Sequence, residues 1–313
     1  MDTTENTDAT ENTVHLTVDP ALTAPAPTSA SPQWWGADSV RARLRDVDTG
    51  RTVFLKTMTP AASTCIDIPG SFAVATAAGD AGIGPRVLDA DPGRGELAME
   101  DLTDSYRTAS VRDFNDPDVT GRFVEKRRAM WDLHVPGARR AGIFDDIRAL
   151  LGRCTAAGVA LPTDLPWMLS VLDDVESRIT AAGTDTVLVH GDANASNLAV
   201  NRVTGEAKLL DYDWAAYTDP LQDIGSVLLE MSSNDLRPEE IFELYWGSFD
   251  LGLYSRAMCY RAADAVRGGL IGAWVDHCDP GTYEYSKFSD WMFLWARETL
   301  GERRYDDFLE EMS

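Results

Sequence analysis

Lysine, histidine and cysteine are all scarce in this chain of 313 residues. The 4 cysteines lie far apart with no C-x-x-C spacing, and the 4 histidines form no H-E-x-x-H pattern. We therefore expect neither a disulfide framework nor a structural zinc site. No run of about 18 apolar residues occurs, so we expect no membrane-spanning helix.

The N-terminus lacks the features of a targeting segment. It is acidic and polar, whereas a secretory signal needs an apolar stretch and a mitochondrial presequence needs arginine and few acids. We therefore expect a cytoplasmic protein with no membrane partner. Residues 1–33 are rich in Thr, Asp, Asn and Ala and end in APAPTSASP, which predicts a disordered acidic lead.

Positive charge is also in short supply, with 28 basic against 51 acidic residues and a net charge of −23. Such a surface repels nucleic acid, so we expect no nucleic-acid partner. The acidity would suit a cationic substrate, although solubility or adaptation to salt explains it more simply. Lysine is so rare that each one is a candidate for a specific role: Lys56, Lys126, Lys208 and Lys287.

The chain does contain a β-rich part followed by a helical part. Alternation from residue 39 onward and a turn at residues 48–50 predict a β-hairpin, and a helix and a strand–turn–strand follow. From about residue 112 the apolar spacing becomes helical. The sequence therefore predicts an α+β fold with a small N-terminal lobe, residues 34–102, and a larger helical lobe, residues 103–313.

Residues 188–225, LVHGDANASNLAVNRVTGEAKLLDYDWAAYTDPLQDIG, interrupt the helical part. A hairpin with its turn at residues 204–205 would bring Asn197 close to Asp211 at the end of the returning strand. Their amide and carboxylate oxygens are hard ligands that suit Mg²⁺ together with phosphate oxygens. Asp192 would lie at the edge of this site, where it could take a proton from a hydroxyl during transfer of a γ-phosphoryl group.

The pattern H-G-D-x-x-x-x-N followed by L-D-Y-D-W-A resembles the catalytic segment of the aminoglycoside phosphotransferase and choline kinase superfamily, which are small-molecule kinases with the protein-kinase-like bilobal fold. The resemblance implies that Asp192 is the catalytic base and that Asn197 and Asp211 hold magnesium. Asp213 becomes a further metal or substrate contact. The two residues that would brace the loop are His190 and Asp223.

Two other interpretations of the hairpin stay open. One is a surface hairpin whose aspartates only cap turns. The other is a calcium loop, but the run D-Y-D-W-A-A lacks the third ligand and the glycine of an EF-hand.

A kinase needs a nucleotide site ahead of the catalytic segment, and the resemblance supplies one. Lys56 ends an apolar run that resembles the strand whose lysine contacts the phosphates. Gly36 to Ser39 stand where a phosphate-covering loop is expected, with a single glycine, and residues 99–101 would meet adenine. The helix that follows offers no acid to pair with Lys56, and Asp67 is the nearest candidate. The predicted nucleotide contacts are Lys56, Ser39, Met99, Glu100 and Asp101.

The acceptor pocket would lie in the helical lobe, where tryptophans are frequent. Aromatic walls can hold an ammonium group by cation–π attraction, and Trp274, Trp291 and Trp295 are the predicted residues. The alternative is that these rings only fill the core. We expect an ATP- and Mg²⁺-dependent phosphotransferase, monomeric or homodimeric, that acts on a hydroxyl of a small amine-bearing molecule: choline- or ethanolamine-like, an aminosugar or an aminoglycoside. The alternative is a catalytically silent nucleotide-binding relative that acts as a regulatory module.

Overall fold

A computed structural model describes residues 24–25, 39–231, 237–280 and 284–312. The predicted acidic lead therefore lies outside the described residues except for 24–25, and so does Gly36 of the predicted phosphate loop. The strands are β1 (Ala24–Pro25), β2 (Ser39–Arg45), β3 (Thr52–Met58), β4 (Val87–Asp91), β5 (Glu96–Glu100), β6 (Tyr106–Thr108), β7 (Val187–Val189), β8 (Leu198–Asn201), β9 (Ala207–Leu209) and β10 (Ala216–Thr218). The helices are α1 (Ile68–Asp80), α2 (Pro117–Met130), α3 (Ile143–Ala157), α4 (Leu165–Ala182), α5 (Pro220–Glu230), α6 (Pro238–Trp246), α7 (Leu251–Cys278), α8 (Tyr285–Gly301) and α9 (Arg303–Glu311).

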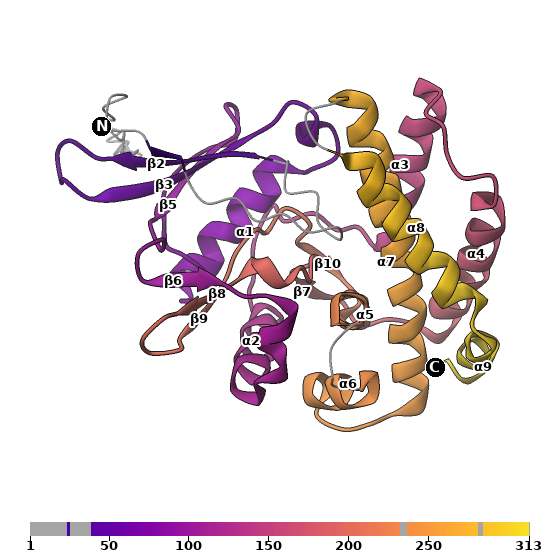
Figure 1. Cartoon of the computed structure of the whole chain (residues 1–313). Coiled ribbons are helices and arrows are strands. Elements are labelled where there is room, and N and C mark those ends of the chain that lie inside the picture. The colour runs from indigo at the N-terminus through magenta and orange to yellow at the C-terminus, as the bar shows by residue number, and fades with distance from the viewer. Residues whose placement is uncertain (1–23, 26–38, 232–236, 281–283, 313) are drawn as a thin grey trace, which may run out of the picture.

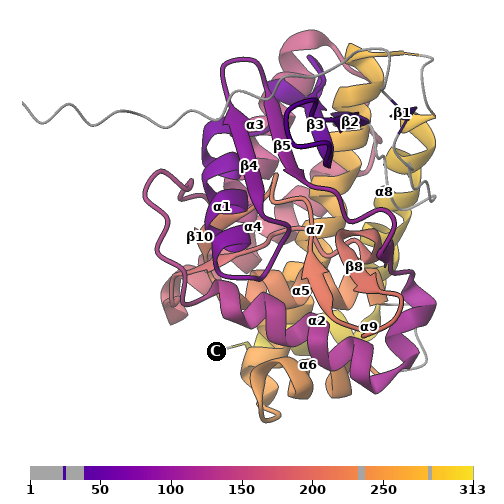
Figure 2. The same cartoon turned by 90° about the vertical axis from the view of Figure 1, so that its left-hand side faces the viewer.

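The N-terminal part is built on an antiparallel sheet in the order β1-β2-β3-β5-β4. The predicted hairpin is confirmed as β2 and β3, which pair from Ser39↔Met58 to Arg45↔Thr52. Lys56 lies on β3 between Arg41 of β2 and Leu97 of β5, so it occupies the middle of the sheet. Helix α1 packs beside β4 in this part of the molecule (Figure 2).

The C-terminal part is organised around α7, which is 28 residues long and buried over most of its length. Helices α8, α5 and α3 pack on it, and Figure 1 shows α7 among them on the side away from the sheet. Small residues allow this close approach: a Cβ added to Gly269 would lie 2.8 Å from the ring of Phe293 on α8. No helix within the described ranges is long and apolar enough to cross a bilayer.

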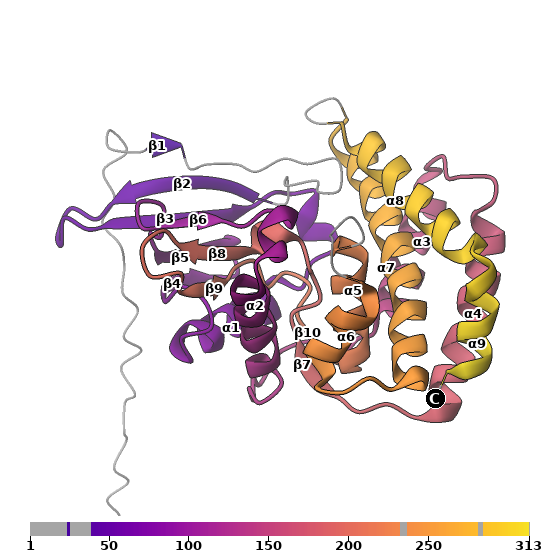
Figure 3. The same cartoon turned by 60° about the horizontal axis from the view of Figure 1, so that its bottom comes forward.

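Two small sheets, β6-β8-β9 and β10-β7, lie between these parts (Figure 3). The second predicted hairpin is confirmed as β8 and β9, with Leu198 opposite Leu209. Antiparallel pairing of β7 with β10 places Leu188 opposite Tyr217. As a result, the loop after β7 and the loop after β9 lie next to each other.

Helix α5 begins as its sequence predicts. The Asp219 carboxylate accepts a hydrogen bond from the Leu221 backbone N–H, and Pro220 occupies the first turn, where no intrahelical donor is needed. Leu221, Ile224, Leu228 and Met231 lie on one face of this segment and are buried in the core. This helix start matters for the site because the first turn of α5 carries Asp223.

Candidate active site

Asp192 lies on the loop between β7 and β8, in a fixed conformation. Its Oδ1 accepts a hydrogen bond from the Asn194 backbone N–H and its Oδ2 accepts one from the Asn197 amide, each 2.9 Å long. Gly191 precedes it with a φ of 77°, and a Cβ there would lie 2.3 Å from the backbone oxygen of Trp214. Burial raises the pKa of Asp192 to about 6, and the neighbouring charge of Asp211 acts in the same direction.

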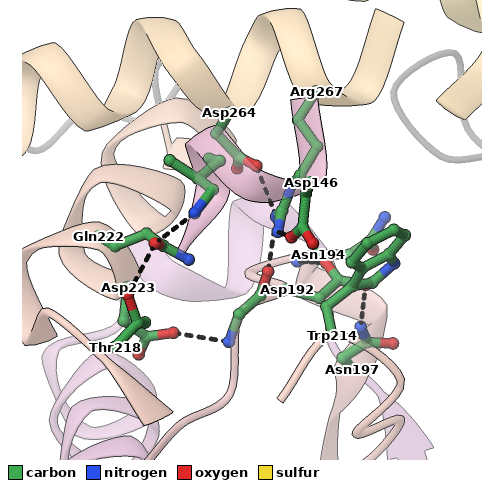
Figure 4. Close-up of polar contacts among 12 residues, drawn as sticks. Asp146, Asp192, Asn194, Asn197, Trp214, Thr218, Gln222, Asp223, Asp264 and Arg267 are labelled. Atoms are coloured by element: carbon green, nitrogen blue, oxygen red, sulfur yellow. Dashed lines mark hydrogen bonds and ion pairs between the residues drawn. The ribbon is translucent and has the colours of Figure 1, made fainter. Parts of the chain in front are cut away.

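Buried charged groups bind the backbone of the loop that carries Asp192 and hold it in place. The Asp223 carboxylate is fully buried, accepts the Gly191 backbone N–H at 2.9 Å and forms a two-pronged ion pair with Arg127 at 2.6 and 3.0 Å. Arg127 also donates to the backbone oxygen of Asp192 at 2.8 Å. Arg267, on α7, donates to the backbone oxygen of Gly191 at 2.7 Å (Figure 4). Both carbonyl groups that flank the Gly191–Asp192 peptide unit are therefore bound by arginine.

His190 joins the two neighbouring loops. Its Nε2 lies 2.9 Å from the backbone oxygen of Leu210, and its ring packs against Tyr212 with centroids 5.0 Å apart. Burial lowers the pKa of His190 to about 3, so the ring is neutral at pH 7. His190 and Asp223 therefore both contact the loops that carry Asp192 and Asp211.

The loop after β9 presents two carboxylates to one lysine. Lys56 Nζ lies 2.8 Å from Asp211 Oδ1 and 2.7 Å from Asp213 Oδ2. Asp211 has a φ of 63°, the one positive value outside glycine in the described part of the chain. The intervening Tyr212 hydroxyl donates instead to the backbone oxygen of Leu209. The sheet and the second hairpin are therefore connected by a buried ion cluster.

The predicted magnesium donors can be tested against this geometry. An ionised Asp192 only accepts hydrogen bonds, so Asn197 must turn its nitrogen toward Asp192, and its amide oxygen remains as the metal donor. Asn197 and Asp211 line the same cavity as Lys56. An amide oxygen and a carboxylate are the hard ligands that Mg²⁺ takes together with water and phosphate, so this donor set fits that ion.

This cavity, of about 320 Å³, lies between the first sheet and the second hairpin. Of the predicted nucleotide contacts, Lys56, Met99 and Glu100 line it. Ser39 and Asp101 do not: Ser39 begins β2 opposite Met58, and the Asp101 carboxylate accepts the Arg43 Nε–H at 2.7 Å. The cavity has more apolar than polar lining, and its further residues include Phe54, Phe72, Leu97, Leu102 and Tyr106.

A second cavity, of about 80 Å³, lies on the other side of Asp192. Trp295 lines it, as predicted for the acceptor pocket. Trp274 and Trp291 do not line it. Trp274 donates through Nε1 to Thr64 Oγ1 at 2.7 Å, and Trp291 packs against the hydrophobic core and the ring of Trp295. Sequence reasoning missed most of the other lining residues: Trp214, Ser226, Glu230, Asp264, Arg267, Phe288 and Met292.

The two acids of the second cavity differ in their partners. Asp264 forms an ion pair with Arg267 at 2.6 Å (Figure 4). The Arg267 guanidinium also lies over the ring of Trp214, 5.0 Å from its centroid. Glu230, at the end of α5, accepts the Ala195 backbone N–H at 2.8 Å and forms no ion pair with any described residue. Burial, with smaller contributions from the charges of Asp192 and Asp264, raises the pKa of Glu230 to about 7.

Known proteins can now be compared with this arrangement. A model described as a phosphotransferase enzyme family matches residues 34–257. The chain is 25% identical over 133 residues to a protein named probable choline kinase 2 from Arabidopsis thaliana, a match that covers 41% of this chain and 37% of that one. The match thus spans little more than a third of that relative's length.

Two solved structures extend the comparison to the fold. A choline/ethanolamine kinase family protein from Mesorhizobium loti superposes with a TM-score of 0.74 at 20% identity, over 91% of this chain and 92% of that chain. Amicoumacin kinase in complex with AMP-PNP, Ca²⁺ and Ami superposes with a TM-score of 0.60 at 13% identity, over 91% and 90% of the two chains. The predicted kinase-like α+β fold is therefore confirmed.

Proposed function

Because this chain belongs to the phosphotransferase enzyme family, we propose that it moves the γ-phosphoryl group of ATP to a hydroxyl of a small cationic amine. The observation that carries the proposal is the position of Asp192 between two cavities. Its carboxylate binds Asn197, which lines the larger cavity, and Asp192 itself lines the smaller one. A group in this place can reach a hydroxyl on one side and a transferred phosphoryl group on the other.

The larger cavity is the proposed nucleotide site. Met99 and Glu100 would lie along adenine, Lys56 would contact the phosphates, and Asn197 and Asp211 would hold Mg²⁺. AMP-PNP and Ca²⁺ are present in the structure of amicoumacin kinase, which supports a nucleotide and a divalent ion for this fold. The metal would neutralise phosphate charge during transfer.

Asp192 is the proposed base for the acceptor hydroxyl. With its pKa near 6 the carboxylate is ionised at pH 7, so it can accept the hydroxyl proton as the oxygen attacks phosphorus. Its hydrogen bonds to Asn194 and Asn197 fix its orientation, while each carboxylate oxygen keeps a further lone pair for the acceptor.

The smaller cavity is the proposed acceptor site, and Glu230 gives it a preference for positive charge. Asp264 is neutralised by Arg267, whereas Glu230 brings a buried carboxylate with no cationic partner among the described residues. The rings of Trp214, Phe288 and Trp295 provide the apolar and π surface that an ammonium group needs. A volume of about 80 Å³ favours a small amino alcohol over an aminoglycoside.

The test is phosphoryl transfer from Mg-ATP to a panel of choline, ethanolamine, thiamine, aminosugars and aminoglycosides. We expect turnover with a small amino alcohol and none with an aminoglycoside. ATP binding without turnover on any member would instead support the silent regulatory module. Absence of ATP binding would contradict both functions.

A further inference from the structure

Helix α1 carries no acid in the position from which kinases usually hold the strand lysine. Protein kinases pair that lysine with a helix glutamate. In α1 the one acid is Asp80, at the last residue of the helix. Asp67, the nearest candidate from the sequence, precedes the helix and accepts the Gly70 backbone N–H at 3.3 Å as an N-cap. A carboxylate for Lys56 therefore has to come from another element.

Asp213, on the loop after β9, supplies that carboxylate. Its Oδ2 lies 2.7 Å from Lys56 Nζ, and both side chains are 7% exposed. Desolvated, charge-assisted contacts of this kind hold a lysine more firmly than exposed ones do. Asp213 also lines the larger cavity, so the lysine that it holds points into the space proposed for the phosphates.

Asp211 and Asp213 approach the lysine from different surroundings. Asp211 is more exposed, at 17%, and its charge contributes to the raised pKa of Asp192, which places it toward the catalytic loop. Asp213 is less exposed, at 7%, and lines the larger cavity together with Ser71 and Phe72 of α1. Asp213 therefore faces the same cavity as the helix that lacks the acid.

We propose that Asp213 is a positioning residue for Lys56: it replaces the missing helix acid and leaves the metal to Asn197 and Asp211. The inference rests on the proposed function and departs from the prediction of Asp213 as a metal contact. Under this proposal the loop after β9 both binds the metal, through Asp211, and positions Lys56, through Asp213. The two residues are two positions apart, and both side chains contact Lys56.

The first experiment separates a metal ligand from a lysine partner without using turnover. The affinity for AMP-PNP is measured by calorimetry with and without Mg²⁺ in the wild type, Asp213→Asn and Asp211→Asn. We expect the gain in affinity on adding Mg²⁺ to stay within about twofold of wild type in Asp213→Asn and to fall by about tenfold or more in Asp211→Asn. An equal loss in both variants would overturn the proposal.

The second experiment tests whether a carboxylate on α1 can replace Asp213 as the partner of Lys56. Ser71 lines the same cavity from α1, so Ser71→Glu places a carboxylate on the helix face toward Lys56. We expect Asp213→Asn to lower kcat by about tenfold or more, and addition of Ser71→Glu to restore most of it. Restoration by Asp213→Glu but not by Ser71→Glu would count against the proposal.

A double-mutant cycle tests whether Asp213 acts through Lys56. In the Lys56→Met background, Asp213→Asn should change kcat by less than about twofold, because the lysine it positions is gone. Full additivity of the two changes would contradict the proposal. Absence of AMP-PNP binding in the wild type would count against the proposed function itself, so the two failures can be told apart.

Discussion

The environment of Asp192 combines a fixed carboxylate with fixed carbonyl groups on either side of it. Asn194 and Asn197 orient the side chain, while Arg127 and Arg267 bind the backbone oxygens of Asp192 and Gly191. A proton acceptor works best when its geometry is set before the substrate arrives. In the proposed reaction, the arginines would therefore act through the backbone of the loop.

The first residue-scale prediction concerns Asp192 itself. Asp192→Ala should lower kcat by at least ~10²-fold and leave ATP binding nearly intact, because the change removes a positioned base and not a phosphate contact. Steady-state kinetics and calorimetry measure the two effects. The matched control is Asp173→Ala on the exposed face of α4, which should behave as the wild type. An unchanged rate in Asp192→Ala would remove the assigned base.

The second prediction concerns Glu230 and pH. Its pKa is raised to about 7, so the carboxylate is increasingly protonated as the pH falls through 7, and the attraction for an acceptor cation is lost below that pH. Choline keeps its charge at every pH, so its binding in the presence of AMP-PNP should weaken as the pH is lowered from about 8 to about 6.

The control for this prediction is Glu230→Gln. The variant should bind choline about 10–100-fold more weakly at pH 8, the range for loss of a buried charged contact, and should lose the pH dependence near 7. Choline binding that keeps its pH dependence in Glu230→Gln would show that another group is responsible.

The residues of the proposed acceptor pocket show where sequence reasoning stops. Asp192, Asn197 and Asp211 could be predicted because they are close together in a pattern of fixed spacing. Glu230 and Asp264 have no such signal: neither belongs to a motif, and only the packing of α5 against α7 brings them to one cavity. Trp214 directly follows Asp213 in the sequence, so it could have been considered as a site residue for that reason.

At the scale of elements, the close approach of α5 to α7 depends on one glycine. A Cβ added to Gly225 would lie 2.7 Å from both the backbone oxygen of Ala257 and the Cβ of Tyr260. Backbone atoms of a long buried helix cannot move aside individually. The position of Asp223 and Glu230, on the same helix as Gly225, therefore depends on this contact.

Gly225→Ala should lower the free energy of unfolding by about 1–3 kcal/mol, the usual effect of overpacking. The matched control is Gly152→Ala on α3, where a Cβ would meet nothing within 4 Å. That variant should gain about 0.5–1 kcal/mol from the better helix propensity of alanine. Urea denaturation measures both. Equal stability of the two variants would contradict the packing described for α5.

The elements themselves were predicted unevenly, and the reason is physical. The two hairpins can be recognised in the sequence by alternating apolar residues and by turn residues. Helix α5 can be recognised by the Asp219–Pro220 pair at its start. Strands β6 and β10, each 3 residues long, were missed. So short a strand has no measurable period, and each pairs with a partner that is distant in the sequence, β8 and β7 respectively.

At the scale of the whole molecule, buried or half-buried lysines connect the first sheet to the rest of the chain. Lys56 on β3 contacts Asp211 and Asp213, and Lys208 on β9 contacts Glu100 of β5 at 2.6 Å. These two are half of the lysines in the chain. The rarity of lysine drew attention to all four residues, and Lys56 and Lys208 both form ion pairs between the first sheet and the rest of the chain.

The net charge of −23 leads to a prediction for the whole molecule. Repulsion among so many carboxylates destabilises the compact state, and salt screens it, since the Debye length falls from about 30 Å at 0.01 M to about 8 Å at 0.15 M. The melting temperature at pH 7 should therefore rise over this range of NaCl. At pH 5, nearer the sequence pI of 4.4, the rise should be smaller. A melting temperature independent of NaCl at pH 7 would contradict this.

The ion cluster at Lys56 has a consequence for how ligands enter. Without a nucleotide, the ammonium group already neutralises the acid proposed to hold the metal. When a magnesium nucleotide binds, the ion pair between Lys56 and Asp211 would be replaced by two contacts to the ligand: Lys56 with phosphate and Asp211 with the metal. A nucleotide that arrived without the metal would draw Lys56 away from Asp211 and leave that acid without a counter-charge, so nucleotide and metal should arrive as a single neutralising unit.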